Sequence, residues 1–322
     1  MRTIKLDLKD RKLLFELDQN CRQSLTKLGR KIGLSKNVVA YRLKCLEETG
    51  VIESYYPVID ASKLGYFSVR IYLFLQYVTP ELSQEIKNYF IAQPNVWWCA
   101  YCEGSTDVAL IIWVKDIDQF YNFWQETLAN YGNHFKDQYV HLYNKLFHYY
   151  YEYLVHKKHK ELAPLITGGT SSQIPLDAID RTILQELHTD ARKPIVAMAK
   201  NIGCSAIQVK HRMKKLLREG IIKGFRLNLN LGLLDTVFVK VDLRLRDHTH
   251  LPKILGYIQQ NPRLVYVNKA IGLGDIEVEF HFDHVNQLHD AMTDIKKKFP
   301  GMIRYYTYFL VKKTTKKSTV PV

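Results

Sequence analysis

The segment GLSKNVVAYRLKCLEETGVI, residues 33–52, recurs in altered form as GCSAIQVKHRMKKLLREGII, residues 203–222. The two segments align without a gap at an offset of 170 residues. The identical pairs are Gly33 and Gly203, Ser35 and Ser205, Val39 and Val209, Arg42 and Arg212, Lys44 and Lys214, Leu46 and Leu216, Gly50 and Gly220, and Ile52 and Ile222. A self-match at one fixed spacing indicates an internal repeat.

The repeat extends in both directions from this segment. Residues 6–35 align with residues 176–205 at the same offset. Further along, at an offset of 168, the aligned pairs are Pro94 and Pro262, Gly104 and Gly272, and Asp107 and Asp275. The chain therefore consists of two copies of one module of roughly 150 residues, the size of one or two small domains. Residues 156–175 between them are charged and then rich in Gly, Ser and Thr, which predicts a flexible linker.

The composition favours a soluble protein with an acidic partner. The chain has 322 residues, 47% of them hydrophobic, and a formal net charge of +14. A basic excess favours nucleic acid as a partner. The five cysteines at irregular spacing do not form a disulfide framework, the charged N-terminus does not resemble a signal peptide, and the apolar run of residues 108–114 cannot span a bilayer. We therefore expect a cytoplasmic protein.

The first 50 residues of each copy predict three short helices. Asp7, Ser24 and Ser35 precede apolar periodic segments and can cap their N-termini. Gly33 supplies a turn before the third helix, and Gly50 ends it. The following residues 51–60, VIESYYPVID, predict a strand and turn that form a wing. We expect winged helix-turn-helix domains at residues 1–60 and 176–230.

The remainder of each copy alternates strands and helices. Residues 66–78 are rich in aromatic and β-branched residues and predict a strand, and residues 81–94 predict a helix. A strand pair joined at Gly104 follows, then a helix and a last strand. The order β-α-β-β-α-β predicts a ferredoxin-like domain at residues 61–155 and at 231–313, with a basic tail at 314–322. The predicted fold class is therefore α+β.

The third helix of each copy turns an apolar stripe inward and a polar, basic face outward. Residues 193–226 contain nine Lys or Arg residues and one acid, Glu219. Such a face on the last of three helices suits the major groove of DNA. Arg42 and Arg212 lie beside the inward stripe, so phosphate contact and a salt bridge within the helical unit are both open. The residues expected at DNA are Ser35, Lys36, Asn37, Tyr41, Arg42 and Lys44, and Ser205, Gln208, Lys210, His211, Arg212, Lys214 and Lys215.

These motifs resemble the Lrp/AsnC, or feast/famine, family of transcription regulators. The resemblance rests on LDLKDRKLLFEL, on residues 32–52, and on a second half with a G-x-x-D loop, present twice. It implies winged helix-turn-helix binding to double-stranded DNA, dimerisation through the second halves, and an amino acid or similar effector near the loop. The effector-binding residues implied are Gly104, Asp107, Gly272 and Asp275. Their alternative interpretation is as turn and capping residues.

Family members usually carry one module and form homodimers, whereas this chain carries two. We therefore expect an internal pseudo-dimer whose two β-α-β-β-α-β sheets face each other, and a homo-oligomer built from such units. The outward helix faces differ between the copies, which predicts two non-identical DNA half-sites.

Other functions have weaker support in the sequence. The C-x-x-C of Cys99 and Cys102 lies in a predicted strand, where neighbours three apart face opposite sides. No spacing joins the histidines into a metal site, and no catalytic triad or paired carboxylates stand out, so we expect no enzyme, metal or cofactor. Two alternatives stay open: an enzyme similar to the sirohaem decarboxylases, which share the two-part architecture, and an architectural DNA-coating protein.

Overall fold

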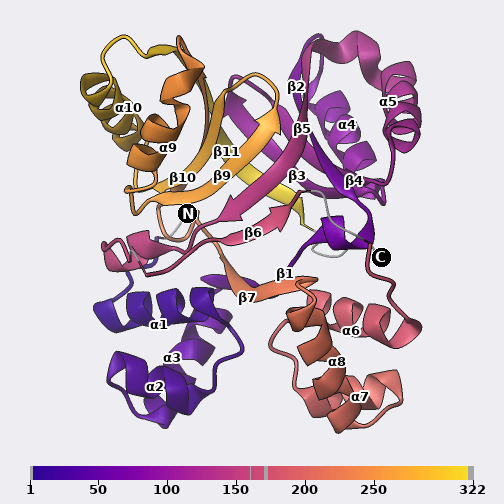
Figure 1. Ribbon diagram of the computed structural model, residues 1–322, viewed down its shortest axis with the longest axis vertical. Helices are drawn as coiled ribbons and strands as arrows, with labels where there is room; N and C mark the ends of the chain where they lie inside the picture. Colours follow the sequence, from indigo (N-terminus) through magenta and orange to yellow (C-terminus); the bar gives the residue numbers. More distant parts are fainter. Residues whose placement is uncertain (1–2, 160, 170–172, 318–322) are drawn as a thin grey trace.

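The computed structural model describes residues 3–159, 161–169 and 173–317. Two three-helix units lie on one side of a large sheet, and helices cover the outer faces of that sheet (Figure 1). The fold is α+β, as the sequence predicts. Within the described residues, no helix is long and apolar enough to cross a membrane.

The two three-helix units form as the capping pattern predicts. The first holds α1 (Leu8–Gln19), α2 (Leu25–Ile32) and α3 (Lys36–Glu48), and the second holds α6 (Ala178–Thr189), α7 (Ile195–Ile202) and α8 (Ala206–Arg218). The side chain of Asp7 caps α1 and that of Ser24 caps α2. Gly33 ends α2 with φ 68°, a left-handed conformation that favours glycine. Pro194 begins α7 without a side-chain cap.

The strand predicted for the wing of each copy forms half of a two-stranded ribbon shared by the two copies. The strand β1 (Ile52–Ile59) pairs antiparallel with β7 (Ile222–Leu229), its counterpart in the other copy. Each helical unit also bonds to the other copy's strand: Cys21 N–H donates to Phe225 O (2.9 Å) and Ala191 N–H donates to Tyr55 O (3.1 Å). The predicted strand is therefore present, and the second copy supplies its partner, because a lone strand would leave its backbone groups unpaired.

The second half of each copy has the same element order. In the first copy this half comprises η1 (Ala61–Leu64), β2 (Phe67–Leu75), α4 (Pro80–Ala92), β3 (Val96–Gly104), β4 (Val108–Val114), α5 (Ile117–Tyr131), η2 (Gly132–His134) and β5 (Phe135–His148). In the second copy it comprises β8 (Val237–Leu245), η4 (His248–His250), α9 (Leu251–Ile258), β9 (Leu264–Ile271), β10 (Ile276–Phe282), α10 (Asn286–Lys298) and β11 (Ile303–Lys317).

The two sheets are joined edge to edge instead of simply facing each other. The strand order is β2-β4-β3-β11-β8-β10-β9-β5-β6, and β5 pairs again with β2, which closes the sheet. The joins are β3 with β11 and β5 with β9, each between the copies. Helices α4 and α5 cover the first copy's strands, and α9 and α10 cover the second's (Figure 1). Closure leaves the two four-stranded sheets without open edges.

The predicted linker and tail are partly ordered strand. Within residues 156–175, β6 (Leu165–Gly168) pairs with β5, after the short helix η3 (Glu152–Val155). In the predicted basic tail, β11 continues to Lys317, and Thr314 pairs with Ala100. Residues 160, 170–172 and 318–322 lie outside the described part of the chain. Both corrections have one cause: a neighbouring strand satisfies the backbone of a segment whose composition reads as loop.

Buried polar and charged pairs cross the join between the copies inside the closed sheet. Arg70 Nη1 of β2 lies 2.7 Å from Glu279 Oε1 of β10, and His141 Nδ1 of β5 lies 2.6 Å from Glu277 Oε1. Lys240 also reaches Glu277, at 3.1 Å. Glu277 and Glu279 both belong to the second copy. The aligned positions in the first copy hold Ala109 and Ile111, which are not acidic. The interiors of the two copies are therefore complementary and not identical.

A second buried pair fixes the first helical unit on the ribbon. Asp18 of α1 and Arg226 of β7 are fully buried and share two hydrogen bonds, of 2.7 and 2.8 Å. Tyr151 N–H donates to Asp18 Oδ2 (2.7 Å), and Arg226 Nη2 donates to Tyr149 O (2.9 Å). Removing one partner of such a pair leaves an uncompensated buried charge.

We expect Asp18→Asn to lower the free energy of unfolding by about 3 kcal/mol, because Arg226 then stays buried without a counter-charge. Denaturant unfolding of the full chain measures this. Lys44→Gln, at the exposed Lys44–Glu48 pair (3.6 Å), is the control and should leave stability unchanged. Equal stability of both variants would contradict the role given to Asp18.

Candidate nucleic-acid interface

The third helices α3 and α8 expose a continuous outer face. Buried residues Val39, Leu43 and Leu46 hold α3 on its unit, and the equivalent residues do so for α8. The exposed residues are Lys36, Asn37, Val38, Tyr41, Lys44, Glu47 and Glu48 on α3, and Ile207, Gln208, Lys210, His211, Lys214, Leu217 and Arg218 on α8. Most of the predicted DNA-contacting residues therefore lie on one accessible face of each helix.

Two large apolar side chains stand out on these faces. Tyr41 is 70% exposed and Ile207 is 71% exposed. They are not at equivalent positions, since Tyr41 aligns with His211 and Ile207 aligns with Asn37. An exposed apolar group on a groove-reading helix can contact the methyl group of thymine, while Asn37 can pair with adenine. The two faces therefore differ in apolar as well as polar groups.

Ser35 and Ser205 have a structural role at the start of these helices. The Ser35 hydroxyl accepts from Val38 N–H (3.3 Å) and the Ser205 hydroxyl from Gln208 N–H (3.1 Å). These are N-cap bonds, which satisfy amides that have no partner within the helix. Both serines set where the outward face begins.

Arg42 and Arg212 tie the third helix to the first. Arg42 Nη1 lies 2.7 Å from Asp7 Oδ2 and 2.7 Å from Asp10 Oδ1, and Arg42 is 26% exposed. Arg212 pairs likewise with Asp177 and Asp180. The bond from Asp10 N–H and the guanidinium of Arg42 hold the pKa of Asp7 below its usual value. Of the two roles left open by the sequence, the structure provides the salt bridge.

Charge on the two faces is unequal. Lys44 pairs along the helix with Glu48 (3.6 Å), so the first face carries an acid beside its lysine. On α8, Lys215 turns back to Asp180 (3.3 Å), which leaves Lys210, Lys214 and Arg218 on the outer face. The second face is thus the more basic of the two, even though Lys215 is not part of it.

The G-x-x-D loops are built into the join between the copies. Asp107 Oδ2 accepts from Leu75 N–H (2.7 Å), and Asp275 Oδ2 accepts from Leu245 N–H (2.7 Å). Both carboxylates therefore cap the end of a neighbouring strand. Gly104, at φ 123°, lies so close to the second copy's β11 that a Cβ would be 2.8 Å from Tyr308 O.

The second loop is equally close to the other copy. A Cβ on Gly272 would overlap the ring of His141, and Leu273 N–H lies 3.4 Å from His141 Nε2. Within the part of the chain that the structure describes, the glycines of both loops have a packing reason. The alternative interpretation of Gly104, Asp107, Gly272 and Asp275 as turn and capping residues therefore accounts for their geometry.

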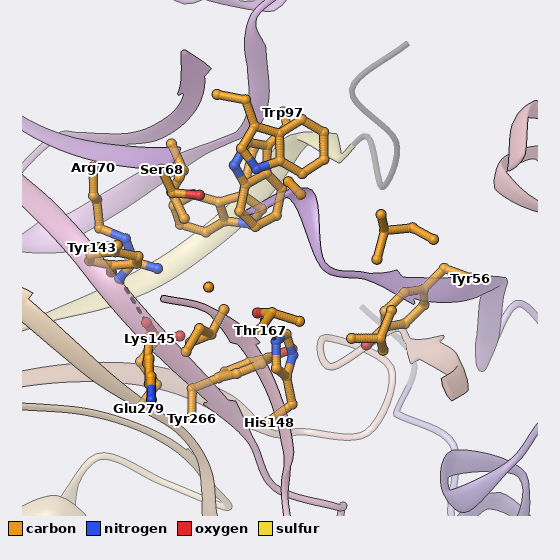
Figure 2. A pocket seen from close by; sticks show the side chains of 18 of the residues that line it. Tyr56, Ser68, Arg70, Trp97, Tyr143, Lys145, His148, Thr167, Tyr266 and Glu279 are labelled. Carbon is orange, nitrogen blue, oxygen red and sulfur yellow. Dashed lines mark hydrogen bonds and ion pairs between the residues drawn. The ribbon is translucent and has the colours of Figure 1, made fainter. Parts of the chain in front are cut away.

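A cavity of about 570 Å³ lies between the ribbon and the closed sheet (Figure 2). Its lining includes Arg70 of β2, Trp97 of β3, Tyr143 and Lys145 of β5, and Tyr266 of β9. None of the four predicted effector residues lines it. The aromatic residues of VWWCAYC, residues 96–102, indicate a strand in the sequence but not which strand lies opposite.

Among the residues that the structure describes, one cluster has metal-ligand residue types. Atoms of His141, Asp242 and Glu277 lie within 4.8 Å of one another. The ammonium group of Lys240 contacts both carboxylates and so already provides a cation there. Cys99 and Cys102 lie on β3, and burial raises the pKa of the Cys102 thiol. In the first set, therefore, a side chain of the protein balances the charge of the carboxylates.

Comparison with known proteins agrees with the helical units. A model of winged helix-turn-helix DNA-binding domains matches residues 6–53, and a model of the AsnC-type helix-turn-helix domain matches residues 176–217. With the exposed third helices, these matches define a DNA-binding transcription regulator. Three relatives are the proline dehydrogenase transcriptional activator of Rhodobacter capsulatus (31% identical), the regulator Ptr1 of Methanocaldococcus jannaschii (32%) and the regulator AzlB of Bacillus subtilis (33%).

These alignments cover 81%, 82% and 80% of the relatives but only 38%, 38% and 39% of this chain, about one copy. The chain belongs to the Lrp/AsnC family of transcription regulators, in tandem-duplicated form. Among solved structures, the siroheme decarboxylase NirDL matches with a TM-score of 0.64 at 13% identity, covering 96% of this chain and 92% of that one. This likeness concerns the fold.

We expect Arg42→Met to change stability and Lys44→Met to change DNA binding. Arg42→Met should lower the free energy of unfolding by about 1 kcal/mol through loss of the Asp7 and Asp10 contacts. Lys44→Met should leave stability unchanged and reduce the salt slope of DNA binding by about 1. Thermal unfolding and DNA titration at several salt concentrations measure both, and a larger stability loss in Lys44→Met would refute the assignment.

Proposed function

We propose that this protein is a sequence-specific transcription regulator in which one chain reads two non-identical DNA half-sites. The observation that carries the proposal is the pair of exposed, chemically different third helices on one shared ribbon. In this proposal Asn37, Tyr41 and Lys44 read one half-site, and His211 and Lys214 belong to the set that reads the other. Major-groove reading by such helices is typical of the class.

The ribbon supports a fixed spacing between the two half-sites. β1 begins at Ile52, four residues after α3 ends, and β7 begins at Ile222, four residues after α8 ends. The antiparallel pairing of β1 with β7 thereby links both helices through short connections. A rigid link of this kind favours one half-site separation over others.

We assign each β-α-β-β-α-β half to a ferredoxin-like domain, in the bounds 61–155 and 231–313. The strand order β5-β2-β4-β3 in the first copy, repeated as β11-β8-β10-β9, supports this assignment. The chain then acts as an intramolecular pseudo-dimer that assembles into a homo-oligomer. The proposal also includes binding of an amino acid at Gly104, Asp107, Gly272 and Asp275. Such a ligand would contact only those atoms of the two loops that are exposed.

Selection from random double-stranded DNA tests sequence reading. We expect a two-part motif whose halves differ, preferred over a scrambled duplex by ~10³-fold or more at fixed salt. A strictly symmetric consensus would contradict the two-reader proposal. Binding without preference that collapses steeply with salt would indicate an architectural DNA-coating role instead.

The charge difference between α3 and α8 gives a separate prediction. Lys210→Glu and Lys214→Glu, made together, should weaken binding to the selected duplex by ~3-fold or more per reversed lysine beyond the loss in Lys44→Glu, since Glu48 already offsets the charge of Lys44. Titration of labelled DNA with each purified variant measures this. Equal losses per reversed lysine would argue that both faces bind DNA alike.

A second candidate function is an enzyme similar to the sirohaem decarboxylases. The full-length likeness in fold to the siroheme decarboxylase NirDL and the 570 Å³ cavity favour it. The exposed basic face of α8 favours the regulator. Addition of sirohaem to the purified chain separates the two candidates. A stable haem-type absorbance spectrum together with carbon dioxide release would establish the enzyme. The absence of both signals would exclude the enzyme.

A further inference from the structure

The cavity of Figure 2 is made jointly by the two copies. Tyr56, Trp97 and Tyr143 line it from the first copy, and Phe238 and Tyr266 line it from the second. Its volume of about 570 Å³ falls within the range of about 300–1,000 Å³ typical of small-molecule sites. We propose that this cavity binds a planar aromatic carboxylate and that the ligand regulates DNA binding by contacting the ribbon.

Flat rings form much of the cavity wall. Trp97 and Trp113 stack with ring centroids 5.1 Å apart and planes 18° apart. The Arg70 guanidinium lies 5.5 Å from the Trp98 ring centroid and 4.9 Å from that of Tyr143. Aromatic surfaces of this kind favour a planar aromatic ligand, which can stack on them or meet them edge to face.

Donor groups on this wall have no acceptor among the described residues. They are Trp97 Nε1, the Tyr143 hydroxyl and Arg70 Nε, all buried. The indole and guanidinium groups can only donate, and Arg70 is 4% exposed. Burial raises the pKa of Tyr143 well above its usual value, so its hydroxyl keeps its proton. Buried donors are costly unless an acceptor meets them, which favours a ligand with carboxylate oxygens.

Charge at the mouth agrees with an anionic group. Lys145 lines the cavity, is exposed, and forms no ion pair within the described ranges. Glu279 is engaged by Arg70 (2.7 Å) and by Asn268 Nδ2 (2.9 Å). The other lining acid, Glu53, is exposed, where water screens its charge. Of the charged lining groups, Lys145 is therefore available to an anionic ligand.

The site also touches the element that carries the DNA-reading helices. Ser54, Tyr56 and Val58 line the cavity from β1, and Asn228 and Leu229 line it from β7. A ligand that contacts both strands would bias the geometry of the ribbon and hence the separation of α3 and α8. This regulatory step rests on the proposed function, whereas ligand binding itself does not.

Calorimetric titration of the full chain without DNA tests the site. The probes are 2-naphthoate, its neutral isostere 2-naphthamide, and the non-aromatic cyclohexanecarboxylate. We expect one naphthoate per chain, bound ~10-fold or more tightly than either comparison compound, as charge-assisted hydrogen bonds and ring contacts both contribute. Equal binding of naphthoate and naphthamide, or no binding, would overturn the proposal.

Ring-preserving variants place the ligand in this cavity. Trp97→Phe and Tyr143→Phe each remove one donor, and each should weaken naphthoate binding ~5-fold or more with little change for naphthamide and unchanged melting temperature. Trp124→Phe is the matched control, because Trp124 stacks on Phe120 and Phe135 outside the cavity. A similar loss in the control, or no loss in either cavity variant, would overturn the placement.

A DNA arm separates this inference from the proposed function. With the selected duplex, saturating naphthoate should change affinity ~3-fold or more in the wild type and less in Tyr143→Phe. Ligand binding with unchanged DNA affinity would overturn the regulatory coupling. Specific ligand binding in a protein that binds no DNA would refute the proposed function and support the cavity as a ligand site.

Discussion

The buried pairing of Arg70 with Glu279 and of His141 with Glu277 makes the two copies dependent on each other. Each four-stranded sheet ends in open edges, and each copy closes the edges of the other. Charge complementarity determines which copies can pair. If two copies of the first kind paired, Arg70 would be buried opposite Ile111, which aligns with Glu279, and would have no acid as its partner. An unpaired buried charge is strongly unfavourable, so the interior favours pairing of unlike copies within one chain.

Closure of the sheet also determines where the DNA-reading units sit. The β1–β7 ribbon brings together segments 170 residues apart, and each helical unit hydrogen-bonds to the strand of the other copy. The Asp18–Arg226 pair strengthens only one of these contacts, because the aligned positions are His188 and Tyr56. The two units are therefore held in similar places by different interactions, which matches the different chemistry of their outer faces.

The same architecture encloses a cavity that the DNA-binding role does not require. NirDL shares the overall fold at 13% identity, and a shared fold does not by itself imply a shared function. This chain presents exposed lysines and Tyr41 on the third helices, and indole, phenol and guanidinium donors around the cavity. Function must be argued from those groups.

Local features of the sequence were enough for the repeat, the three-helix units, the strand and helix order, and the outward face of α3 and α8. Caps such as Asp7 and Ser35 and the apolar stripe of each helix act over a few residues, so spacing reveals them. The partner of β1, closure of the sheet, the turn of Lys215 away from the outer face, the Arg42 salt bridge and the aromatic cavity emerged only in three dimensions. Strand periodicity tells which side chains share a face but not which strand lies beside it, and these features all depend on contacts between residues far apart in the chain.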